Sequence, residues 1–78
     1  MNPKIIGRSI QKLRAGFGLS RATLAEYAGC SQQSVRLIEL GRANPELKTL
    51  NNLASALGTT VEALAAGGAR AKNTNKGD

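Results

Sequence analysis

The chain has 78 residues, of which 11 are Lys or Arg and 5 are Asp or Glu, so its formal net charge is +6. This length allows one domain, and the basic balance favours a polyanionic partner. A single cysteine, Cys30, and no histidine exclude an intramolecular disulfide and a zinc site of Cys and His ligands. No segment approaches the roughly 20 apolar residues of a membrane span, and the N-terminus lacks the apolar run of a signal peptide, so we expect a cytoplasmic protein without membrane contacts.

The first helix is predicted from about Pro3 to Ala15. Asn2 is a suitable N-cap, and a proline suits the first helical position. Glycines at positions 16 and 18 end the helix. Apolar residues recur at helical spacing and predict one buried stripe: Ile6, Ile10, Leu13 and Phe17.

Residues 20–41 predict two further short helices joined by a tight turn. Ser20 caps the first of them, and Leu19 and Leu24 are spaced as a hydrophobic staple around this cap. Gly29 ends this helix, at a position where a left-handed residue is often needed.

The next helix repeats the arrangement. Ser31 is its cap, and Cys30 and Val35 are its staple. Val35 and Ile38 face inward, and Gly41 closes the helix. The link between the two helices is only about three residues long and contains a glycine, which is what a helix-turn-helix requires.

The rest of the chain predicts a loop and two more helices. Pro45 disfavours helix in the loop over residues 42–46. A helix over residues 47–57 and a short helix capped by Thr60 follow, with apolar stripes formed by Leu50, Leu53, Ala54 and Leu57 and by Val61 and Leu64.

The sequence therefore predicts an all-α fold, a compact five-helix domain over residues 1–66 with a helix-turn-helix inside it. Residues 67–78 have no apolar pattern and a net charge of +2, from three basic residues and one aspartate. We expect them to form a disordered basic tail.

The helix that begins after Ser31 carries polar side chains suited to nucleic-acid recognition on its outer side. Glutamine can pair with the N6 and N7 atoms of adenine, and arginine with the O6 and N7 atoms of guanine. An apolar side chain can contact the methyl group of thymine. The candidates are Gln32, Gln33, Arg36 and Leu37. The alternative is an ordinary solvated surface, but exposed Leu37 and Leu40 are costly unless DNA or another protein covers them.

Several motifs together resemble the phage repressor/Cro (Cro/C1-type) helix-turn-helix family, also called the xenobiotic-response-element family. The likeness covers about residues 6–64 and implies a lambda-repressor-like DNA-binding fold. Its motifs are Ile6-Gly7, Ile10 and Leu13-Arg14, then Leu19-Ser20, Leu24-Ala25 and Gly29-Cys30-Ser31, then Val35, Ile38-Glu39 and Gly41, then Pro45, Thr49-Leu50, Leu53-Ala54 and Ala56-Leu57-Gly58.

This resemblance implies roles for individual residues. It makes Gln32, Gln33, Arg36 and Leu37 the base-reading positions on double-stranded DNA. It also implies contacts to the DNA backbone, which fix register and make affinity depend on salt but carry no sequence information directly. These backbone positions are Arg21, Ser31, Arg42 and Asn44. At position 21 the family usually has a glutamine, so Arg21 is a departure from the pattern.

The resemblance implies two structural contacts as well. Arg14 and Glu39 match a pair that forms an ion pair between the first and third helices of the family. The region from Thr59 to Leu64, with Val61 between them, matches a dimer interface.

The function expected from these observations is a sequence-specific transcriptional regulator, a repressor or autoregulator that binds a palindromic operator as a homodimer. The alternative is an antitoxin or a restriction-modification controller, which would also bind a toxin or another protein partner through the same fold. We find no catalytic constellation and expect no cofactor and no enzymatic activity.

Overall fold

The computed structural model describes residues 2–68. They form five α-helices and, within these residues, no strand: α1 (Pro3–Gly16), α2 (Arg21–Ala28), α3 (Gln32–Glu39), α4 (Leu47–Ala56) and α5 (Val61–Ala65). The predicted all-α class and helix order are confirmed. Two boundaries differ by one residue, because α1 continues through Gly16 and α4 ends before Leu57. The tail predicted from position 67 lies outside the described residues from position 69 onward.

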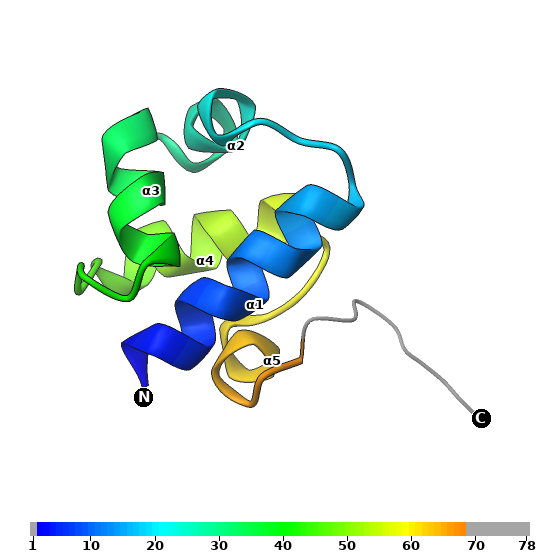
Figure 1. Ribbon diagram of the computed structural model, residues 1–78, viewed down its shortest axis with the longest axis vertical. Coiled ribbons are helices and arrows are strands. Elements are labelled where there is room, and N and C mark those ends of the chain that lie inside the picture. The colour runs from blue at the N-terminus through cyan, green and yellow to red at the C-terminus, as the bar shows by residue number, and fades with distance from the viewer. Residues whose placement is uncertain (1, 69–78) are drawn as a thin grey trace.

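Helix α1 lies between two neighbours, with α3 on one side and α5 on the other (Figure 1). Helix α2 packs against both α3 and α4, so α4 is joined to the helix-turn-helix through α2. Within residues 2–68, no helix has both the length and the apolar character needed to cross a bilayer.

Side-chain caps fix where most of these helices begin. Asn2, Ser20, Ser31 and Thr60 each accept hydrogen bonds from backbone N–H groups two or three residues later, at 2.9 to 3.3 Å. These are the four caps predicted above, and all are confirmed. Such a cap satisfies donors that have no partner inside the helix, and replacing it with alanine costs about 1 kcal/mol.

A single apolar core holds the helices together. It contains all the residues that the helical spacing predicted to face inward, with the exception of Phe17. The buried set is Ile6, Ile10, Leu13, Leu24, Ala25, Ala28, Val35, Ile38, Leu50, Leu53, Ala54, Leu57, Val61 and Leu64. Cys30 is half-buried against this core, and burial raises the pKa of its thiol.

The prediction that Phe17 belongs to the buried stripe is wrong. Its side chain is 57% exposed. Phe17 is the C-cap of α1, and the chain turns away through Gly18, whose φ is +71°. Helical spacing no longer determines where a side chain points once the helix has ended, so the stripe stops at Leu13.

Helices α1 and α3 make direct backbone contact at Gly7. A Cβ atom at this position would lie 2.2 Å from the carbonyl oxygen of Ile38 and 2.7 Å from that of Glu39. Real Cβ atoms do not approach oxygen so closely, so only glycine permits this crossing. Gly7 thereby sets how closely α3 lies against the rest of the domain.

Two side-chain hydrogen bonds join helices that are distant in the sequence. The hydroxyl of Ser9 donates to the carbonyl oxygen of Leu64 at 3.1 Å and joins α1 to α5. The amide Nδ2 of Asn52 donates to the carbonyl oxygen of Ala28 at 3.2 Å and joins α4 to α2. Ser9 is buried, so removing its hydroxyl would leave a buried carbonyl without this partner.

Candidate nucleic-acid interface

The turn between α2 and α3 leaves the N-terminus of α3 at the surface of the domain. Gly29 is the C-cap of α2 and adopts the left-handed conformation, with φ 70° and ψ 35°. The amide of Cys30 then donates to the carbonyl oxygen of Ala25 at 3.0 Å, which closes the end of α2. Ser31 follows in extended conformation and starts α3 at once. The link therefore consists of Gly29, Cys30 and Ser31, as the sequence predicts.

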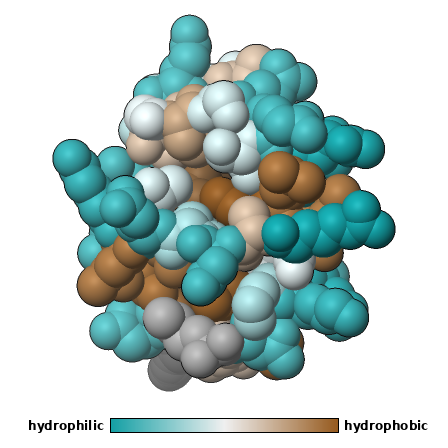
Figure 2. All heavy atoms as spheres, turned by 90° about the vertical axis from the view of Figure 1, so that its left-hand side faces the viewer, coloured by the Kyte–Doolittle hydropathy of each residue, from teal (hydrophilic) through white to brown (hydrophobic). Residues whose placement is uncertain are grey.

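Helix α3 has one buried side and one open side. Val35, Ile38 and Glu39 are buried against the domain. The open side carries Gln32, Gln33 and Arg36, which are all exposed. No acidic residue lies in the first turn of α3, so no carboxylate of this turn offsets the positive end of the helix dipole. In Figure 2, hydrophilic side chains cover most of the side of the molecule on which α3 lies, with hydrophobic surface between them.

The two leucines on α3 differ in their exposure. Leu37 is half-buried, so part of its side chain is already packed on the domain. Leu40, the C-cap of α3, is 49% exposed. Leu37 can therefore present one edge to a ligand, and Leu40 leaves more apolar surface open at the end of the helix.

Glu39 lies at the centre of an ion-pair network behind α3. Its Oε2 atom accepts from Nε of Arg14 at 2.5 Å, and its Oε1 atom accepts from Nε of Arg21 at 2.9 Å. Arg14 also donates from Nη1 to the carbonyl oxygen of Leu19 at 2.8 Å. The Glu39 side chain is 1% exposed, whereas that of Arg21 is 37% exposed. The network joins the first, second and third helices through one buried carboxylate.

Arg21 belongs to this network, although the sequence predicted only a contact between its side chain and the DNA backbone. The structure shows its Nε atom bonded to Glu39, with more than a third of the side chain open to solvent. Its guanidinium has further N–H donors, so one face can hold Glu39 while another meets a phosphate oxygen. Arg21 therefore has N–H donors left over while it holds Glu39, the last residue of α3.

The other residues expected to contact the DNA backbone lie at the two ends of α3. Arg42 and Asn44 are exposed on the loop that follows the helix. Ser31 is exposed at its start, but its Oγ atom lies 2.9 Å from Oγ of Ser34 and also accepts from the Ser34 amide at 3.0 Å. One of the two hydroxyl protons lies between these oxygens, so the pair has a single proton left for a phosphate.

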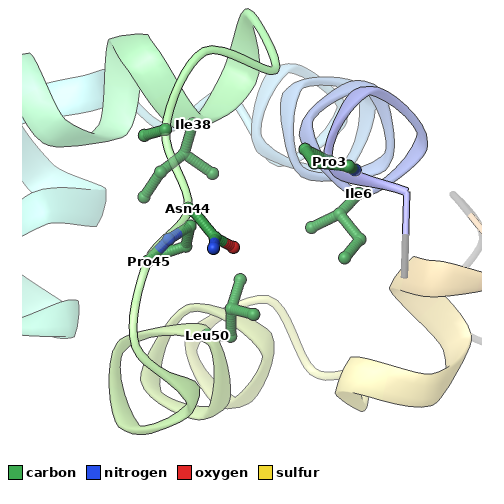
Figure 3. Close-up of a pocket in the computed structure, with 7 residues that line it drawn as sticks. Pro3, Ile6, Ile38, Asn44, Pro45 and Leu50 are labelled. Atoms are coloured by element: carbon green, nitrogen blue, oxygen red, sulfur yellow. The ribbon is translucent and has the colours of Figure 1, made fainter.

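A small pocket lies beneath the loop after α3, between the start of α1 and the start of α4. Its volume is about 40 Å³, and apolar residues form most of its wall (Figure 3). The amide of Asn44 points toward the space between Ile6 and Leu50 in this view. Ligand pockets for drug-sized molecules measure about 300–1,000 Å³, so this pocket is too small for such an effector. Among the described residues, no cluster of His, Cys, Asp or Glu side chains could hold a metal ion.

The residues predicted for a dimer interface lie at or near α5, and two of them belong to the core of one chain. Val61 and Leu64 are buried there, while Thr59 is half-exposed. A shallow groove runs beside them, between α4 and α5. Leu47 lies at its edge with 60% of its surface exposed. The groove is lined by Leu47, Asn51, Val61, Glu62, Ala65 and Ala66.

Comparison with known proteins identifies this arrangement. The model of a helix-turn-helix family matches residues 10–64, which include the whole of α2, α3 and α4, the second half of α1 and all of α5 except its last residue. The chain belongs to the Cro/C1-type helix-turn-helix family. It is thus a member of a family of DNA-binding transcriptional regulators, proteins that generally have no enzymatic activity.

Relatives of this helix-turn-helix chain come from phages and bacteria. It is 33% identical over 63 residues to a transcriptional regulator derived from the SPbeta prophage of Bacillus subtilis, covering 81% of this chain and 58% of that protein. It is 39% identical over 59 residues to the immunity repressor protein of Bacillus phage phi105, covering 76% of this chain and 41% of the repressor. The chain therefore spans about half the length of these two relatives.

A solved structure has a similar fold. It is that of the clp gene regulator ClgR from Corynebacterium glutamicum, which matches with a TM-score of 0.80 and 25% identity over 88% of this chain and 73% of that one. This likeness agrees with the five-helix domain described above.

Proposed function

We propose that this helix-turn-helix chain is a repressor or autoregulator that binds a palindromic operator as a homodimer. One observation carries the proposal: the open side of α3 presents Gln32, Gln33 and Arg36 to solvent while its other side is fixed against the domain. A helix held in this way can enter a major groove with its N-terminal residues facing the base edges.

The exposed side chains of α3 have the chemistry of base reading. Gln32 and Gln33 can each donate to N7 and accept from N6 of adenine in the required paired geometry, and Arg36 can donate twice to guanine. The open edge of Leu37 suits a thymine methyl group. Each well-placed pair discriminates against a wrong base by about 1–3 kcal/mol.

Contacts to the DNA backbone would hold α3 in register. Arg21, which is bonded to Glu39 in the last turn of α3, and Arg42, on the loop after the helix, supply positive charge near α3. The Ser31–Ser34 pair supplies a neutral donor, and Asn44 would supply another once its amide turns outward from the pocket in which it lies in Figure 3. These groups recognise phosphates in any sequence, so they determine affinity and its salt dependence more than specificity.

The dimer would place two copies of α3 about 34 Å apart, in successive major grooves. The groove between α4 and α5 is the best-supported contact surface, because Leu47 is exposed there next to Val61, a residue of the predicted interface. Thr59 remains available at the surface, whereas Val61 and Leu64 act mainly by holding α5 in place.

The test of base reading is Gln33→Ala. We expect it to remove most of the preference for the operator over random DNA, by about 30-fold or more, since a homodimer loses two bidentate pairs and each pair discriminates by about 1–3 kcal/mol. The operator is obtained by selecting bound sequences from random DNA, and binding is measured by mobility shift. Gln11→Ala removes an exposed glutamine from α1 and is the matched control. Unchanged selectivity in the Gln33 variant would contradict its assignment as a base reader.

The test of the dimer surface is Leu47→Glu. A charge at this position should prevent burial of the groove, so the variant should sediment as a monomer at concentrations at which the wild type is a dimer. Glutamate suits the first turn of α4, so the helix itself is not expected to weaken. Phe17→Glu changes a residue of similar exposure, 57% against 60%, and is the control. A dimer that survives the Leu47 change would place the interface elsewhere.

One observation favours the alternative of an antitoxin or controller protein. Leu40 is 49% exposed at the end of α3, and an apolar surface of this kind can also bind a protein. A small toxin gene next to this gene would support that function. The specific measurement is binding of the purified toxin, which Leu40→Ser should weaken if Leu40 takes part.

A further inference from the structure

The first turn of α1 lies against Gly41, two residues after the end of α3. Lys4 is exposed in this turn. A Cβ atom built at Gly41 would lie 2.8 Å from Cγ of Lys4 and 3.0 Å from its Cα. The stem of Lys4 therefore passes over Gly41, immediately before Arg42. This position brings a residue from the start of the chain beside the loop that the proposed function assigns to phosphate contact.

The positive charges on the exposed side of α1 favour binding of a polyanion along this helix. The helix has no acidic residue, and its exposed side carries Lys4, Arg8 and Lys12, spaced four residues apart. The two lysines at the ends of this row have different surroundings. Lys4 adjoins the end of α3, whereas Lys12 lies about two turns further on, in a groove lined also by Ala66 and Gly67 beyond α5.

We propose that Lys4 is a further phosphate-contacting residue, which extends the DNA surface from the loop after α3 onto the first turn of α1. Its ammonium group would meet a backbone phosphate beside the one bound by Arg42. The inference rests on the proposed function, because the phosphates are placed there only if α3 enters the groove.

A purely structural role for Lys4 is the competing explanation. The aliphatic stem of Lys4 can cover Gly41, and its ammonium group can interact with the last carbonyl groups of α3. That role would change the thermal stability of the protein, but it would leave unchanged the number of counterions released on binding DNA. The salt dependence of binding therefore separates the two roles.

The experiment measures the dissociation constant against salt concentration for the full chain and for Lys4→Gln, Lys4→Arg and Lys12→Gln, each with the selected operator and with random DNA. Loss of one phosphate contact from each subunit of the dimer should reduce the slope of log K against log salt by about 1.8 and weaken binding roughly 30-fold near physiological salt. Lys4→Gln should show this change on both DNAs, while Lys4→Arg and Lys12→Gln keep the wild-type slope.

Two results would overturn the proposal: an unchanged slope for Lys4→Gln, whatever its melting temperature, or an equal fall in slope for Lys12→Gln. Failure of the proposed function would look different. In that case the wild-type chain itself would show no preference for any selected sequence over random DNA.

Discussion

Replacing Gly7 with alanine is expected to destabilise the domain by about 3 kcal/mol, the upper end of the usual cost of overpacking. The added methyl group would lie 2.2 Å from the carbonyl oxygen of Ile38 and 2.7 Å from that of Glu39. Both neighbours are backbone atoms, so no side chain can rotate away, and α1 and α3 must separate. For a domain of this size, each lost kcal/mol lowers the melting temperature by about 4–8 °C.

The matched control for this variant lies on the same helix. Gly16 has no atom within 4 Å of the position where its Cβ would lie. Gly16→Ala should therefore stabilise the protein, by up to about 1 kcal/mol, because alanine is the better helix former. The measurement is urea denaturation followed by circular dichroism at low temperature, where a weakened variant is still folded. Equal stability of the Gly7 variant and the wild type would show that the crossing is looser than described.

The effect of Gly7→Ala should extend to DNA recognition. The residues that Gly7 touches are in the last turn of α3, on the side opposite the exposed glutamines. Moving α3 away from α1 would also change the position of its base-reading side chains relative to the loop that holds Arg42. Selectivity for the operator should then fall even at temperatures at which the variant is fully folded.

Local signals in the sequence predict the helix-turn-helix well. Ser20 and Ser31 cap their helices through hydrogen bonds to residues only three positions away, and Gly29 adopts the left-handed conformation that its position requires. Such interactions depend on a few neighbouring residues, so a short stretch of sequence contains all the information. The inward residues of each helix follow from the helical period for the same reason.

Local signals do not reveal contacts between distant residues, and the ion pair between Arg14 and Glu39 is expected only from the family resemblance. Nothing near Ser9 indicates that its hydroxyl reaches Leu64, and nothing near Asn52 indicates the carbonyl of Ala28. The closeness of Gly7 to α3 likewise depends on the packing of the whole domain. The candidate DNA surface is partly of this kind: the exposed residues of α3 follow from its period, but the bond between Arg21 and Glu39 does not.

The second large effect is expected at Glu39. Glu39→Gln should destabilise the protein by about 3–5 kcal/mol, because it leaves the largely buried guanidinium of Arg14, which is 14% exposed, without a negative partner. Arg14→Gln should be costly for the complementary reason, since a carboxylate that is 1% exposed would then depend on Arg21 alone. In the double variant of Arg14 and Glu39 the two costs should not add, and the coupling energy measures their interaction.

Arg21→Gln separates the structural role of this network from its role at DNA. The Arg21 side chain is 37% exposed, so solvent screens its pair with Glu39, and the variant should lose at most about 1 kcal/mol of stability. If Arg21 also contacts a phosphate, the same variant should bind operator and random DNA more weakly, with the salt slope reduced by about 1.8, which is about 0.9 for each subunit of the dimer. Urea denaturation and salt-dependent binding measure the two roles in one protein. A large loss of stability with an unchanged salt slope would make Arg21 a purely structural residue, and the backbone contact beside α2 would have to come from another group.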